Sequence, residues 1–163
     1  VTGVQTCALP ISLHGIDLHS GAYLIHSMRS AKEMKLKAVF SDLVVFSQYP
    51  HAFMTSVETN GGLKIIGLLG KIRLSAGSEE LELAPGELVF CINNSFSRKM
   101  DVELSTLVAT SKLLNDFSVE PVFMKKLKQQ ALIQALRTEK KFRTSVGDVK
   151  GNRNFELKLL PEK

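Results

Sequence analysis

The chain has 163 residues, 44% of them hydrophobic, which is enough to bury a core in one domain of ordinary size without metals or disulfides. No apolar run approaches the roughly 18 residues that a membrane-spanning helix needs, so this sequence contains no transmembrane segment. The net charge of +5 is concentrated in one place, because residues 120–143 hold seven Lys or Arg against two Glu. An electrostatic partner is therefore expected at this segment.

Residues 1–12 show neither a helical nor a strand period. Residues 1–11 resemble the translation of a short-read sequencing adapter, so we expect the segment to be an artefact and the natural chain to begin upstream. On that interpretation Cys7 does not count, which leaves Cys91 alone and no intramolecular disulfide. A signal peptide lost with the natural N-terminus would not be visible here.

Residues 13–60 alternate between apolar and polar side chains in short segments, a pattern typical of strands with one buried face. The apolar run at residues 43–46 predicts a strand that is covered on both faces. Asn60-Gly61-Gly62 is the strongest hairpin signal in the chain. The predicted strands lie at residues 15–26, with a glycine turn between two strands, and at residues 35–40, 43–46 and 53–57.

Residues 61–90 have the clearest strand pattern, with three apolar bursts that each follow a turn. Gly and Pro recur here at intervals of about nine residues, because Gly reaches φ > 0 and Pro pre-sets φ for a turn. The side chains expected to face the core are Ile72 and Leu74, Leu81 and Leu83, and Leu88 and Phe90. The predicted structural turns are Gly21, Gly61, Gly62, Gly70, Pro85 and Gly86.

The pattern changes after residue 100. Residues 101–114 fit either a short helix that begins near Ser105 or a strand followed by a turn, and we favour the helix. Beyond Pro121, apolar residues recur every four positions and form a helical stripe. The stripe consists of Phe123, Leu127, Ala131 and Ala135, flanked by Met124, Leu132 and Leu136. The helix is expected to reach about Phe142 and to stop before Gly147.

The predicted fold is mainly β: a small antiparallel β-sandwich or roll of short strands with a C-terminal amphipathic α-helix. The expected organisation is a β-domain at residues 13–117, a basic amphipathic helix at residues 118–143, and a tail at residues 144–163 with a possible edge strand at 154–159.

No residue pattern points to catalysis or to a cofactor. The four His residues, at positions 14, 19, 26 and 51, have irregular spacing and no Cys nearby, unlike zinc ligands, so we expect solvated or loop histidines. A metal enzyme of the cupin type would require His19, His26 and His51 to cluster. Cys91 has no His or Lys beside it and is expected to be a small core residue. The sequence also lacks a nucleophile elbow and a phosphate-binding glycine loop, so we expect a non-enzyme without a cofactor.

The basic helix is the remaining candidate for a binding site. A helix with cations on one face can dock on an acidic protein, an anionic membrane or nucleic acid. The alternative, which we favour, is a helix that covers the open face of the sandwich and leaves its charges in water. The expected partner is another protein or an acidic envelope component, with no nucleic acid, and the oligomeric state is left open. The candidate partner-binding residues are Lys125, Lys126, Lys128, Arg137, Lys140 and Lys141. The exposed strand faces of residues 63–90 are expected to belong to the same contact surface.

Three segments between about Gly15 and Phe117 resemble the FecR domain family. Residues 15–24 are similar to its strand-Gly-strand opening, residues 62–75 to its glycine-marked hairpin, and residues 81–89 to its turn with a Leu-x-x-Gly-Glu rhythm. The chain departs from the family at His51-Ala52, where Gly-Thr is usual, and at Leu69, where an acidic residue is frequent.

The FecR resemblance implies an all-β domain outside the cytoplasm, in the periplasm or cell envelope. The best-known members relay a signal to an anti-sigma regulator, a role that also needs a membrane helix and a cytoplasmic segment, neither of which is in this sequence. We therefore expect a non-enzymatic extracytoplasmic regulatory or protein-interaction module. The alternative is an envelope- or polysaccharide-binding structural module without a signalling role.

Overall fold

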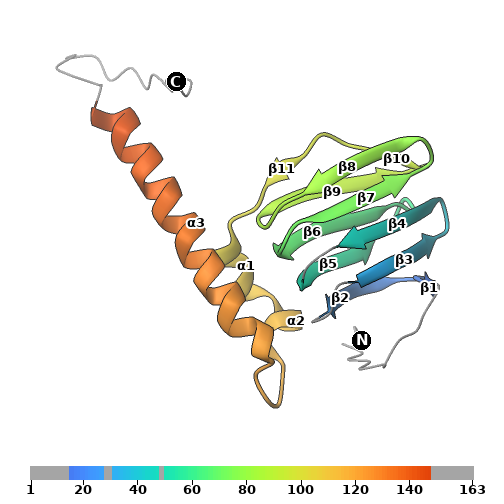
Figure 1. The fold of residues 1–163 in the computed structure, drawn as a ribbon, viewed down its shortest axis with the longest axis horizontal. Coiled ribbons are helices and arrows are strands. Elements are labelled where there is room, and N and C mark those ends of the chain that lie inside the picture. Colours follow the sequence, from blue (N-terminus) through green and yellow to red (C-terminus); the bar gives the residue numbers. More distant parts are fainter. Residues whose placement is uncertain (1–14, 28–30, 48–49, 148–163) are drawn as a thin grey trace.

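Two β-sheets and a layer of helices are stacked in the protein (Figure 1). This computed structural model describes the backbone of residues 15–27, 31–47 and 50–147, and the side chains of residues 15–27, 33–47 and 50–137. The expected artefact at residues 1–12 and the possible strand at 154–159 lie outside the described residues.

The first sheet, sheet A, has five strands in the order β1-β3-β4-β7-β8. Its neighbouring strands are antiparallel except for β1 and β3, which are parallel. The strands are β1 (Ile16–Asp17), β3 (Ala31–Ala38), β4 (Ser41–Ser47), β7 (Ile72–Ala76) and β8 (Glu79–Leu83).

The second sheet, sheet B, is antiparallel throughout, with the order β10-β9-β6-β5-β2 and a further short strand, β11, paired with β9. The strands are β2 (Gly21–Ser27), β5 (His51–Val57), β6 (Leu63–Leu69), β9 (Glu87–Ile92), β10 (Ser95–Phe96) and β11 (Met100–Asp101).

The inner faces of the two sheets form the first core. Phe53, Leu63 and Ile65 of sheet B meet Leu36 and Leu74 of sheet A, and each of the five is at most 1% exposed. Leu63 and Ile65 sit two apart on β6 and face the same core, because successive side chains on a strand point to opposite faces. The predicted fold class, an antiparallel sandwich of short strands followed by a helix, is confirmed.

The helices cover the other face of sheet B and form a second core with it (Figure 1). They are α1 (Leu104–Thr110), α2 (Lys112–Asn115) and α3 (Val122–Gly147). In this core, Ile66 and Leu68 of β6 meet Leu104 of α1, Leu114 of α2 and Leu127 of α3. Among the described residues, no helix is both long and apolar enough to cross a membrane.

Helix α3 begins at Val122, directly behind Pro121, as the position of that proline predicted, although the segment was given an outer bound of 118. The carbonyl oxygen of Pro121 accepts the N–H of Met124. The helix runs past 143 and includes Gly147, although it was expected to stop before this residue. The reason is that residues 143–146 contain neither Gly nor Pro, so nothing interrupts the helix before the first glycine.

The predicted turns divide into reversals within a sheet and crossings between sheets. Gly61 lies in the β5–β6 hairpin of sheet B. Gly70 and Pro85-Gly86 instead carry the chain from one sheet to the other, so the strands on either side of them are not hairpin partners. Gly21, Gly61, Gly70 and Gly86 all have positive φ. Gly62 does not, but a Cβ there would stand 2.9 Å from the carbonyl oxygen of Cys91.

Three expectations about strand faces were wrong. Strand β3 ends at Ala38, and Val39 and Phe40, 66% and 57% exposed, form the turn that follows. Strand β4 is covered on one face only, since no described element lies over the outer side of sheet A, and Phe46 is 37% exposed there. On β9, Val89 and Cys91 face the sandwich core, while Leu88 faces the helices.

Candidate functional site

Helix α3 buries one face in its own domain. Phe123, Met124, Leu127 and Ala131 are at most 5% exposed and lie in the core between sheet B and the helices. Burial of side chains as large as Phe123 and Leu127 contributes on the order of 2 kcal/mol each. The interpretation that the apolar stripe covers the sandwich is therefore confirmed, and only the opposite face of α3 remains open to a partner.

A pair of hydrogen bonds fixes α3 against α1. The Nε2 of Gln134 donates to the carbonyl oxygen of Val102 at 2.9 Å, and the N–H of Leu104 donates to the Oε1 of Gln134 at 2.8 Å. Glu103, at the N-cap position of α1, makes no side-chain cap bond. The carboxamide of Gln134 thus serves a backbone donor that a helix N-terminus leaves without an intrahelical partner.

The described cations of the predicted binding set, Lys125, Lys126, Lys128 and Arg137, are all exposed. Lys128 forms an ion pair with Glu120, whereas the other three form none within the described residues. No Asp or Glu occurs between Val122 and Arg137, so this part of the helix is purely basic. Lys140 and Lys141 lie within α3, but the structure describes only their backbone and not their side chains.

The exposed face of α3 also carries apolar side chains that the sequence interpretation placed wrongly. Leu132 and Leu136 were expected to flank the buried stripe, yet they are 61% and 56% exposed, and Ile133 beside them is 43% exposed. We call these three residues the outer patch. Leu132 follows the buried Leu127 by five residues, and five residues turn an α-helix by about 140° beyond one full turn. This angle could have shown from the sequence that Leu132 does not lie on the buried face of α3.

The other predicted contact surface, the exposed strand faces of residues 63–90, lies elsewhere on the molecule. Strand β6 is buried on both sides, so only β7 and β8 present an open face, where Lys71 pairs with Glu82 at 2.8 Å. This face belongs to sheet A, and sheet B separates it from α3 (Figure 1). The structure does not bring the basic helix and these strands together into one surface.

Two of the histidines are strand residues, not the loop or solvated residues that were expected. His51 is 1% exposed and stacks on Phe53, with ring centroids 5.9 Å apart. The half-buried His26 stacks on Phe123 of α3 at 4.4 Å. Burial disfavours the charged imidazole, and the nearby His51 adds to the effect, so the pKa of His26 lies below its ordinary value.

The three histidines of the cupin hypothesis do not converge. His26 and His51 lie on the adjacent strands β2 and β5, at the end where Ser27 pairs with His51. The exposed His19 precedes the opposite end of β2, and the strand rise places roughly 17 Å between Gly21 and His26. Within the described residues, no group of three or more His, Cys, Asp or Glu side chains could hold a metal ion.

Cys91 has the role that the sequence predicted. Its side chain is fully buried in the core between the sheets. Burial raises the pKa of the thiol above its ordinary value, because a thiolate loses its hydration there. The residue therefore packs as a small hydrophobe.

Comparison with known proteins gives little. No protein-family model and no curated protein matches the sequence. Two solved structures are similar to part of the chain, each described as "a putative anti-sigma factor" from Parabacteroides distasonis. One is 13% identical with a TM-score of 0.43, over 61% of this chain and 48% of its own; the other is 12% identical with a TM-score of 0.42, over 65% and 59%. The chain thus spans about half the length of these structures, and a likeness at this level assigns no function.

Proposed function

We propose that this protein is a non-enzymatic, FecR-like extracytoplasmic regulatory module that works by binding another protein through the exposed face of α3. The resemblance of residues 15–24, 62–75 and 81–89 to the FecR family supports the domain type and a place in the periplasm or cell envelope. The observation that carries the binding role is the outer patch, since its three large apolar side chains stand on the face of α3 that turns away from the domain core.

The outer patch is compact enough to act as one contact. Leu132 and Leu136 are four residues apart, and Ile133 and Leu136 three, so their side chains are neighbours on the helix surface. Full burial of a Leu contributes about 1.5–3 kcal/mol, and the patch leucines are little more than half exposed. Covering each one should therefore contribute on the order of 1 kcal/mol, which suits a patch assisted by charges around it.

Those charges select the kind of partner. Lys128 lies four residues before Leu132, and Arg137 lies four residues after Ile133, so cations flank the outer patch on the helix surface. A second copy of this face would bring like charges together. An acidic protein surface with apolar side chains at its centre complements both features.

The test is capture from an envelope extract of the source organism, followed by affinity measurement with the purified captured protein. The double variant Leu132→Gln/Leu136→Gln keeps the helix and the cations but removes the apolar contact. Val122→Gln is the matched control, since Val122 is 75% exposed on the same helix but ten residues from Leu132. Loss of about 2 kcal/mol of binding free energy predicts that the double variant binds roughly 30-fold more weakly than the wild type. The control should bind with the affinity of the wild type.

Capture of the same protein with equal affinity by the double variant would contradict the proposed surface. Binding should also weaken as salt is raised, because basic contacts to an acidic partner are screened. Retention of the protein by envelope glycan, with no protein partner that depends on the outer patch, would favour the alternative of a structural polysaccharide-binding module.

A further inference from the structure

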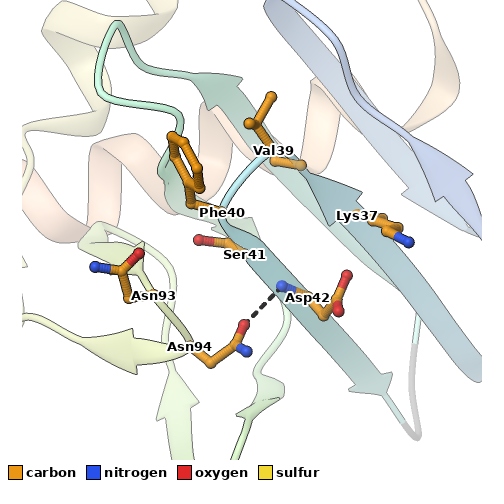
Figure 2. A pocket seen from close by; sticks show the side chains of 8 residues that line it. Lys37, Val39, Phe40, Ser41, Asp42, Asn93 and Asn94 are labelled. Atoms are coloured by element: carbon orange, nitrogen blue, oxygen red, sulfur yellow. Dashed lines mark hydrogen bonds between the residues drawn. The ribbon is translucent and has the colours of Figure 1, made fainter.

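A second candidate site lies away from α3, where the turn between β3 and β4 meets the turn between β9 and β10 (Figure 2). The two turns are more than 50 residues apart in the sequence, and an open groove of about 380 Å³ lies between them. This volume falls at the lower end of the range for small-molecule sites, about 300–1,000 Å³. None of its lining residues belongs to the outer patch or to the helices.

An exposed aromatic ring stands in this groove. Phe40 is 57% exposed, but its position is defined by a neighbouring turn. Its N–H donates to the carbonyl oxygen of Gly61 at 3.4 Å, and its ring lies so close to Gly61 that an added Cβ there would overlap it. A ring held in this way offers an apolar surface to a ligand at little cost in conformational entropy.

Polar side chains line the rest of the groove, with Lys37 and Asp42 on the side away from Phe40 (Figure 2). Asp42 and Lys37 are directly opposite each other in the β3–β4 ladder, yet they form no ion pair within 4.0 Å. The N–H of Asp42 donates to Asn94 Oδ1 at 2.7 Å, which orients that carboxamide and leaves its Nδ2 without a bond to a described residue (Figure 2). Asn93 adds a second carboxamide, on the same side of the groove as Phe40 in this view.

This combination of side chains matches the chemistry of a sugar. A pyranose ring presents an apolar face of C–H groups and a rim of hydroxyls that both donate and accept hydrogen bonds. The phenyl ring suits the face, the carboxylate accepts from hydroxyls, and the carboxamides do both. The opposite charges of Lys37 and Asp42 cancel, so the groove selects neither an anion nor a cation.

We propose that this groove binds a neutral saccharide, with one sugar ring on Phe40 and its hydroxyls bonded to Asp42, Asn93 and Asn94. The open shape of the groove admits a unit within a chain as well as a free sugar. This site is independent of the protein-binding role proposed for α3, and the double variant of the outer patch should bind sugar as the wild type does.

The absence of Trp from the sequence makes a sensitive test possible. Phe40→Trp introduces a single tryptophan at the groove, and Phe46→Trp introduces one at another exposed position that does not line it. Each variant is titrated with maltotetraose, cellotetraose and the fully N-acetylated chitotetraose, all of which are neutral. The proposal expects a saturable change in tryptophan fluorescence for Phe40→Trp with at least one of these sugars, and no change for Phe46→Trp.

Asn93→Gly tests the polar contacts without disturbing the turn, because Asn93 has a φ of 51° that glycine adopts freely. In the Phe40→Trp background it should weaken sugar binding about tenfold, the effect of one lost hydrogen bond. Side-chain amide signals of Asn93 and Asn94 in the wild type, followed by NMR with the same three sugars, show whether the native groove responds. No response to any of the three in both measurements overturns the proposal, as does equal binding after Asn93→Gly.

Discussion

The attachment of α3 to the domain can be tested by replacing Gln134 with alanine. In the structure the carboxamide of this residue accepts the N–H of Leu104 and donates to the carbonyl oxygen of Val102. Alanine removes both bonds while favouring the helix at least as well as glutamine. Both backbone groups are part-buried, and neither has another hydrogen bond that would replace the lost one within the described residues.

The expected loss of stability follows from the two backbone groups that Gln134→Ala leaves without a partner. A buried donor or acceptor left unsatisfied costs about 1–3 kcal/mol, and partial access to water moves each toward the lower end of that range. Gln134→Ala should therefore lower the free energy of unfolding by about 2 kcal/mol. For a chain of 163 residues, this corresponds to a fall in Tm of roughly 4–8 °C.

Urea unfolding and thermal melting, both followed by circular dichroism, measure this loss. Gln129→Ala is the matched control. It is the same Gln-to-Ala change at an exposed position of the same helix, where neither of the two hydrogen bonds is lost. The control should stay within about 0.5 kcal/mol of the wild type. If Gln134→Ala unfolds at the same urea concentration as the control, the two hydrogen bonds do not hold α3 in place.

Gly67→Ala should cost about 1–3 kcal/mol or more, because an added Cβ would overlap the carbonyl oxygen of Ala84, a backbone atom that cannot rotate away. Gly15→Ala, where the nearest atom would be 3.7 Å from the Cβ, should cost far less, and equal losses in urea unfolding would contradict the close approach at Gly67. The lowered pKa of His26 predicts that stability depends on pH, because the unfolded chain binds the imidazole proton more readily than the folded protein. Stability is intact above the ordinary pKa of about 6.5 and falls as the pH drops toward the pKa of His26 in the folded protein. Urea midpoints between about pH 8 and pH 5 should therefore decline less steeply in His26→Gln than in the wild type, and parallel curves would assign the acid sensitivity to other groups.

In sheet A, alternation of apolar and polar residues predicts the buried faces of β7 and β8, because the other face of this sheet is open, but the apolar run in β4 wrongly suggested cover on both faces. Alternation fails in sheet B, where β9 carries apolar Leu88 on one face and Val89 on the other, since cores lie on both sides. The sequence also cannot show whether a turn stays within a sheet. Gly70 and Gly86 look like hairpin turns, yet both lead the chain across the sandwich.

The candidate sites were predictable to different degrees. The basic residues of α3 follow from charge alone, whereas the outer patch required the helical angle between Leu127 and Leu132 to be considered. The groove could not be predicted, because Phe40 and Asn93 come together only through the pairing of sheets and turns. Burial of His26 was hidden for the same reason, because Phe123, on which it stacks, lies in a helix in a later part of the chain.

Sheet B is a wall shared by two cores, and this ties the two halves of the molecule into one folding unit. A chain that ended at Phe117 would keep α1 and α2 but lose Phe123, Met124, Leu127 and Ala131 of α3, and the cluster that holds Ile66 and Leu68 would lose part of its cover. Apolar surface exposed in this way favours self-association. The inner face of α3 thus covers apolar side chains of sheet B, and a partner that displaced this helix would expose them to solvent.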